Sequence, residues 1–399
     1  MGRRTTRGLG DLSRRQLLQR SAAIGAGATA VSFMGRGGSM SRISAQEEIP
    51  RTPSTATVDG TLRILLKDDF HPDHNAFMRA ELEAYAELNG WNIEVTDVAG
   101  YQGGGDLFQK ILGGVQSGDA PDLLIHELGV RNFHTLGLVE PVTDLVTEMT
   151  ELYGEPIQGA KNDSIVDGEW YGVPFFTRAN GYYVRADMFA AAGLDPIADT
   201  ETYDKMRAAA LAVSDPSNNQ WGWGMTINRS GDGNGLVQNV MFRYGGHLQD
   251  ETGQKVTFNS PETIAGFTWL AETYGSEDYA EMLPPGILSW TDTNNNEAFL
   301  AGQIAITQNA GTVYAKAVLD DVPFWENIAY VPVPIRVTDN ARLDFLSTGM
   351  KFYMIKDAKN RAAAEDIARH FLTQPVQDRV WSISTAYALP AYTLSLIHI

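Results

Sequence analysis

Polar and aromatic residues gather directly after the apolar runs in the first third of the sequence. Asp68, Phe70 and His71 follow the first run, Tyr101 follows the second, and Glu127 follows the third. Aromatic rings offer flat apolar platforms, and carboxylate or imidazole groups add directional hydrogen bonds. This combination suits a ligand that has apolar faces and a rim of hydroxyl groups. Asp68 and Glu127 could alternatively act as the acid and base of a glycoside-cleaving enzyme.

The segments around these residues indicate how they are positioned. A strand, helix, strand, helix, strand order is indicated by residues 62–66, 77–88, 91–95, 107–115 and 122–125. Such alternation predicts an α/β fold with a mainly parallel sheet covered by helices. In open sheets of this kind ligands bind at the carboxyl ends of the strands, which favours the loops that carry the polar groups.

Two other kinds of site are disfavoured by the spacing of their residues. Asp68, Asp69, His71, Asp73 and His74 could ligate a metal ion, but their loop spacing matches no strong metal signature. The glycine-rich segment 231–235 lacks the terminal Glu of a calcium loop and the Gly-Lys-Ser/Thr of a phosphate loop. The sequence therefore predicts no metal and no cofactor.

Composition limits the class of protein. The 399 residues suit two lobes of roughly 150–200 residues each. The formal net charge of -18 makes nucleic acid and anionic lipid improbable as general partners. The absence of cysteine excludes disulfides, thiolate metal sites, a cysteine nucleophile and a lipid-modified N-terminal cysteine.

The N-terminus has the order of an export signal. Six arginines within residues 1–20 precede a weakly apolar stretch from Ser21 to Met34, and small residues follow near Ser44 and Ala45. Ser13–Leu18 is similar to a twin-arginine signal. We therefore expect an export signal over residues 1–45, a flexible linker over 46–57, and an exported protein that is not a lipoprotein.

Two helices are marked in the second half. Ser260, Pro261 and Glu262 are typical of a helix start, and a stripe of Ile264, Phe267, Ala271 and Tyr274 precedes Gly275 as the stop. A second helix is predicted from Asn360 to Thr373. Residues 393–399 form an apolar tail without capping residues, which we interpret as a truncated or mis-joined end.

Several segments, in order over residues 60–392, resemble the solute-binding proteins of ABC importers, the family that includes maltose-binding protein. They are Asp167–Pro174, Gly181–Val184, Asn259–Glu262, Ala298–Ile306 with Asn309–Gly311, and Pro332 and Pro334 before Gly349. The resemblance implies two α/β lobes built from discontinuous segments and joined by hinge strands. It implies crossings near 174–180 and 326–331, with lobe 1 formed by 58–175 and 331–392 and lobe 2 by 178–326.

The resemblance also implies a function. A small ligand, expected to be a mono- or oligosaccharide, would lie between the lobes, and closure would be sensed by a membrane permease. The second lobe would contribute Trp223, Trp290, Asp292 and Asn309, with Arg178 near the hinge. The protein is expected to be a monomer and not an enzyme. A secreted carbohydrate-active enzyme, or the same fold binding a peptide or polyamine, remains as an alternative.

Overall fold

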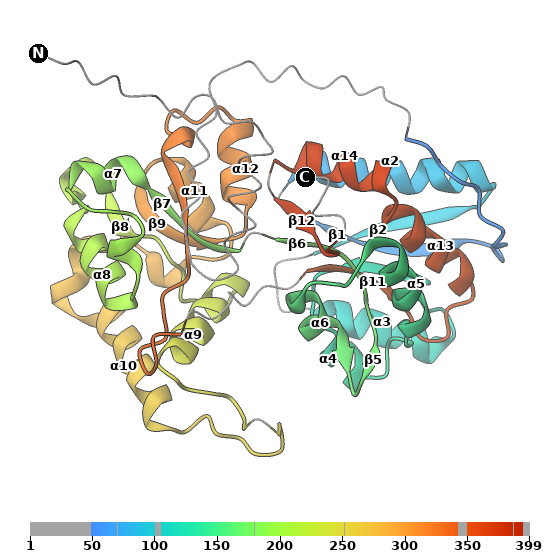
Figure 1. The fold of residues 1–399 in the computed structure, drawn as a ribbon, viewed down its shortest axis with the longest axis horizontal. Coiled ribbons are helices and arrows are strands. Elements are labelled where there is room, and N and C mark those ends of the chain that lie inside the picture. Colours follow the sequence, from blue (N-terminus) through green and yellow to red (C-terminus); the bar gives the residue numbers. More distant parts are fainter. Residues whose placement is uncertain are drawn as a thin grey trace, which may run out of the picture.

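The computed structural model describes residues 49–69, 71–99, 105–178, 180–250, 252–341, 349–385 and 387–393. Two α/β lobes lie side by side, each around its own sheet (Figure 1). The predicted fold class is confirmed. Within the described residues, no helix is both long enough and apolar enough to cross a bilayer.

The sheet of lobe 1 has six strands. In spatial order they are β12 (Ala388–Pro390), β6 (Val173–Arg178), β11 (Met350–Met354), β3 (Leu123–His126), β1 (Leu62–Asp68) and β2 (Ile93–Ala99). The strands β1, β2 and β3 pair in parallel, whereas β11 runs antiparallel to both β3 and β6. The carboxyl ends of β1, β3 and β6 therefore meet at one edge of the sheet.

Helices cover both faces of this sheet. They are α2 (Pro72–Asn89), α3 (Gly105–Ser117), α4 (Val130–Thr135), α5 (Thr143–Tyr153), α6 (Gln158–Ser164), α13 (Arg361–Phe371) and α14 (Gln374–Ser384). Alternate side chains of β1 enter different cores, with Ile64 and Leu66 in one and Leu65 in the other. A short hairpin of β4 (Ile165–Val166) and β5 (Glu169–Trp170) completes the lobe.

Lobe 2 contains a four-stranded sheet. In spatial order its strands are β10 (Ile328–Val331), β7 (Gly181–Arg185), β9 (Ile304–Asn309) and β8 (Trp221–Trp223). Its helices are α7 (Ala186–Ala191), α8 (Tyr203–Ala212), α9 (Gly231–Arg243), α10 (Pro261–Gly275), α11 (Asn294–Leu300) and α12 (Thr312–Leu319). Ala315 of α12 is fully buried in the core cluster of lobe 1, so this helix contacts the other lobe.

The two predicted helices of the second half form, but one buries a different face. The helix α10 starts after Ser260, whose Oγ accepts a hydrogen bond from the Thr263 N–H at 3.2 Å, and it ends at Gly275. Its predicted apolar stripe is only partly correct. Phe267 and Tyr274 pack against the lobe 2 core, but Ile264 is 56% exposed, and Trp269 and Leu270 are buried in that core instead. The large ring of Trp269 packs against Trp223, which rotates the helix relative to the prediction.

The predicted lobe boundaries need correction at both crossings. The strand β6 pairs within the sheet of lobe 1 up to Arg178, so the chain first crosses between Arg178 and Gly181. The return does not lie at 326–331, because β10 pairs with β7. The Val337 N–H still donates to the Arg243 carbonyl of lobe 2 at 2.8 Å. Of the described residues, those within 49–178 and 349–393 thus form lobe 1, and those within 180–341 form lobe 2.

The predicted linker is largely part of lobe 1. Ile49, Ala56 and Val58 pack against the lobe 1 core. Arg51 donates to both carboxylate oxygens of Glu81, at 2.8 and 2.7 Å. The expectation of a flexible spacer is therefore wrong for residues 49–57. The predicted export signal and residues 394–399 lie outside the described residues.

Candidate functional site

Four charged side chains form a closed ring at the carboxyl edge of the lobe 1 sheet. Lys67 Nζ lies 3.0 Å from Asp69 Oδ2 and 3.1 Å from Glu127 Oε1. Arg178 pairs with Asp69 at 2.8 Å and also with Glu127. We call Lys67, Asp69, Glu127 and Arg178 the ion-pair ring. It joins the ends of β1 and β3 to the last residue of β6, as the parallel arrangement of these strands predicts.

The ion-pair ring is buried and supported by one aromatic residue. The Tyr387 hydroxyl donates to Asp69, and its ring lies 4.9 Å from the Arg178 guanidinium. Burial raises the pKa of Asp69, but Lys67 and Arg178 lower it more, so its net pKa is well below the usual range. Burial, followed by repulsion from Arg178, lowers the pKa of Lys67 to about 7 despite the attraction of Asp69.

Two histidines, His71 and His74, closely follow Asp69 in the chain. His71 caps α2, because its Nδ1 accepts a hydrogen bond from the His74 N–H at 3.3 Å. His71 Nε2 and both ring nitrogens of His74 are buried and accept or donate no hydrogen bond among the residues that the structure describes. Burial lowers the pKa of His71, and it lowers that of His74 to about 3, so His74 is neutral at physiological pH. Asp68 is exposed and accepts a hydrogen bond from Asn75 at 2.6 Å.

Two predicted residues of this region, Phe70 and Tyr101, lie outside the described residues. Asp68, His71, Glu127 and Arg178 are all placed at or just after the carboxyl ends of β1, β3 and β6. In the part of the chain that the structure describes, no group of three or more acidic or histidine side chains is arranged to hold a metal ion.

On lobe 2, two acidic residues meet at the start of α9. Asp292 accepts hydrogen bonds from the backbone N–H groups of Gly231 and Asp232, at 3.0 and 2.8 Å. The Asp232 carboxylate accepts a hydrogen bond from the Asn295 amide at 2.9 Å. Burial and, to a smaller extent, the nearby charge of Asp292 raise the pKa of Asp232 to about 7. The glycine-rich segment that contains Asp232 is thus the first turn of a helix and not a loop.

Asn309 lies where lobe 2 meets the crossing. It ends β9 and pairs with Gly181, the first residue of β7. Its Nδ2 donates to Asn296, and its Oδ1 accepts from the Thr312 hydroxyl at 3.2 Å. Gly181 and Arg178 are only three positions apart, so Asn309 and the ion-pair ring flank the same crossing. We call Asp232, Asp292, Asn295 and Asn309 the lobe 2 polar group.

The two predicted tryptophans have different surroundings. Trp223 is completely buried, lies tilted against Trp269 with ring centroids 5.9 Å apart, and donates from Nε1 to the Tyr274 hydroxyl at 2.9 Å. Its prediction as a ligand platform is therefore wrong, because the lobe 2 core encloses the whole ring. Trp290 is half-buried, packs against the edge of that core, and precedes Asp292 by two residues.

Residues 71–378 match the model of the family described as bacterial extracellular solute-binding protein. The chain belongs to this family. A maltotriose-binding protein of Pyrococcus abyssi is 23% identical over 207 residues, which cover 51% of this chain and 40% of that protein. The chain spans less than half the length of the curated relatives it matches.

Solved structures of solute-binding proteins share the fold. An ABC transporter solute-binding protein of Thermotoga lettingae, bound to α-D-tagatose, has a TM-score of 0.71 and 18% identity. The alignment covers 85% of this chain and 83% of that chain. Maltose-bound MalE3 of T. maritima has a TM-score of 0.69 and 19% identity, covering 84% and 82%.

Some site features of this solute-binding protein were missed by sequence reasoning. Lys67 and Asp69 flank Asp68 at the end of a predicted strand. This position was the signal in the sequence that could have indicated them as site residues. Tyr387 gave no signal, because 318 residues separate it from Asp69. Asp232 lies among glycines and Asn295 among asparagines, and these neighbours gave no indication that either residue belongs to a site.

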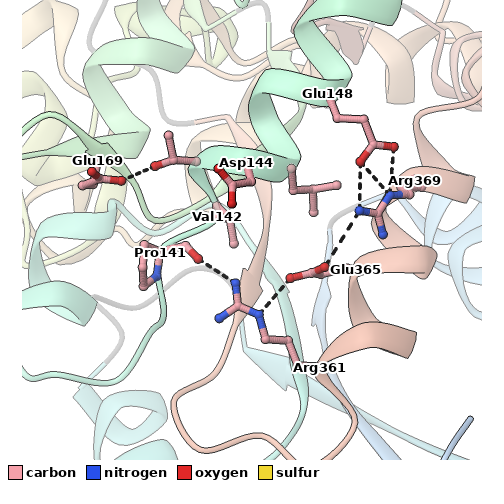
Figure 2. A pocket seen from close by; sticks show the side chains of 10 residues that line it. Pro141, Val142, Asp144, Glu148, Glu169, Arg361, Glu365 and Arg369 are labelled. Carbon is pink, nitrogen blue, oxygen red and sulfur yellow. Dashed lines mark hydrogen bonds and ion pairs between the residues drawn. The ribbon is translucent and has the colours of Figure 1, made fainter. Parts of the chain in front are cut away.

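A separate pocket of about 280 Å³ lies between α5 and α13 of this solute-binding protein (Figure 2). Its two arginines are already paired, because Arg369 of α13 contacts Glu148 of α5 at 2.9 Å and Arg361 contacts Glu365 of its own helix at 2.8 Å. The pocket includes no member of the ion-pair ring. Arg369 thus links the two helices, and the guanidinium groups of both arginines already have acidic partners.

Proposed function

We propose that this protein binds a sugar, as a mono- or oligosaccharide, between the ion-pair ring and the lobe 2 polar group. It would do so as the extracytoplasmic binding component of an ABC importer and would deliver the sugar to a membrane permease. The observation that carries the proposal is the position of these two polar sets on either side of one crossing. A hinge motion at this crossing would bring both sets onto one ligand.

The chemistry of the two sets supports a hydroxyl-rich ligand. The ring offers carboxylate acceptors and guanidinium donors, and the lobe 2 polar group offers carboxylates and amides. Trp290, half-buried beside Asp292, is the aromatic platform that we assign to the ligand. The relatives described as binding maltotriose, tagatose or maltose favour the same class.

The enzyme alternative is weakened by the ring itself. A general acid needs a carboxyl group that keeps its proton, and neighbouring cations favour the ionised form. Glu127 contacts both Lys67 and Arg178, so it is suited to accept hydrogen bonds and not to protonate a leaving group. We therefore propose a binding protein without catalysis.

A thermal-shift screen of the chain from residue 46 onwards tests the ligand class. The panel contains D-tagatose, maltose, maltotriose, amino acids, peptides and spermidine. A ligand at about one hundred times its Kd stabilises the native state by about 2.7 kcal/mol. We expect a raised melting temperature with at least one sugar. A shift only with spermidine or peptides would contradict the proposed sugar ligand but would still be consistent with a solute-binding protein.

Replacement of Trp290 tests the proposed platform. We expect Trp290→Ala to weaken sugar binding by more than about 1 kcal/mol, because a stacked ring loses its contact area. Titration calorimetry with the sugar found in the screen measures the change. An unchanged Kd in a variant that melts cooperatively would remove Trp290 from the site.

The N-terminal segment carries a separate proposal about location. We propose that residues 1–45 direct export through the twin-arginine pathway, with Arg14 and Arg15 as the recognised pair. Arg14→Lys combined with Arg15→Lys should leave the protein inside the producing cell, as measured by fractionation. Normal secretion of that variant would contradict the proposed twin-arginine signal.

A further inference from the structure

The ion-pair ring is balanced in charge. Two cations and two carboxylates each contact both partners of opposite sign, so the ring has no net formal charge. A buried uncompensated charge costs several kcal/mol, which explains why the ring is closed. Asp68, the adjoining carboxylate, is exposed, and solvent therefore screens its charge.

The four members differ in exposure. The side chain of Glu127 is 15% exposed and that of Arg178 is 7% exposed, whereas Lys67 and Asp69 are almost completely buried. Glu127 and Arg178 are therefore the members that a ligand reaches first. Lys67 and Asp69 lie behind them and hold both in place.

We propose, resting on the proposed function, that the ring selects an uncharged pair of neighbouring hydroxyl groups and that Lys67 and Asp69 are the positioning residues that set this selectivity. One hydroxyl would donate to Glu127 while its neighbour accepts from Arg178. A carboxylate or ammonium group on the ligand would add a charge that the balanced ring does not compensate. The ring thus favours a neutral sugar over its acidic and amino derivatives.

Substitutions of Lys67 and Asp69, which lie behind the two contact residues, change the net charge of the ring in opposite directions. Lys67→Met gives the ring a net charge of about −1, and Asp69→Asn gives about +1, by simple count of the charges left. The double variant restores zero with Glu127 and Arg178 intact. It is the matched control for packing, because it removes the same two side chains without unbalancing the charge.

Isothermal titration at about pH 6 uses glucose, glucosamine and glucuronate, because Lys67 is then protonated and both derivatives are charged. Wild type should prefer glucose. Lys67→Met should raise the affinity for glucosamine relative to that for glucose by about tenfold or more. Asp69→Asn should raise the affinity for glucuronate relative to that for glucose by a similar factor. The double variant should return to within about threefold of the wild-type ratios.

Further outcomes decide against the proposal. Equal losses for all three probes in both single variants would assign Lys67 and Asp69 a purely structural role. Lys161→Met, which breaks an exposed ion pair with Glu155, should leave the ratios unchanged; a similar shift there would assign the effect to overall charge. Binding of none of the probes would overturn the inference, while the proposed function would survive if a panel sugar still binds.

Discussion

The two sides of the proposed site are built from different interactions. Lobe 1 presents charges that neutralise each other inside a buried ring. The lobe 2 polar group is held by backbone N–H groups and side-chain amides. A buried charge that loses its ion-pair partner costs several kcal/mol. A lost hydrogen bond costs about 1 kcal/mol between neutral groups and about 1.5–3 kcal/mol where one group is charged. We therefore expect lobe 1 to be the rigid half-site and lobe 2 the more adaptable one.

The largest loss of stability should follow from removing one cation of the ion-pair ring. Arg178→Ala leaves Asp69 and Glu127 with Lys67 as their shared cation and removes the contact with Tyr387. We expect a loss of about 3–5 kcal/mol in the free energy of unfolding, measured by urea denaturation. Asn309→Ala is the matched change on lobe 2 and should cost about 1–2 kcal/mol. Equal costs for both would contradict the difference between the half-sites.

A second substitution tests whether the core of lobe 2 is independent of the proposed ligand site. Trp223→Phe removes the indole N–H that bonds Tyr274 and leaves a gap in the core. We expect a loss of about 2 kcal/mol in unfolding free energy with an unchanged Kd for the sugar. Calorimetric binding at a temperature where the variant is folded measures this. A Kd raised about tenfold would restore Trp223 to the site.

The sequence predicted the lobes better than it predicted the site. Local signals are enough for α10 and for the strand–helix alternation of lobe 1, because caps and apolar periods lie within a few residues. Glu127 was predicted from its position after an apolar run, and Arg178 from the family resemblance. The pairing of both residues with Lys67 and Asp69 depends on which strands become neighbours. The order β6-β11-β3-β1 brings together segments that are far apart in the chain. The burial of Trp223 and the return crossing after β10 depend on the same long-range pairing.

A gain in stability, opposite in sign to the two losses above, should follow from neutralising Asp232. Its folded pKa of about 7 lies above that of an unfolded Asp, so the folded state binds the proton more tightly. This contribution is fully present below about pH 4 and is lost as pH rises through about 7. Asp232→Asn should therefore match wild type near pH 4 and be more stable at pH 8, by up to about 4 kcal/mol for a pKa shift of about three units. Urea denaturation at both pH values measures this; a destabilised variant at pH 8 would contradict it.

The smallest change in stability should come from Asp292→Asn, because two effects oppose each other. The amide keeps one acceptor for the N–H groups at the start of α9 and loses the negative charge that favours a helix N-terminus. Removal of that charge also relieves its repulsion of Asp232. We expect a net change below about 1 kcal/mol near neutral pH, together with a lower pKa for Asp232 measured by NMR titration. If the pKa of Asp232 did not move, burial alone would account for its rise, and the two carboxylates would not act as one unit in the adaptable half-site.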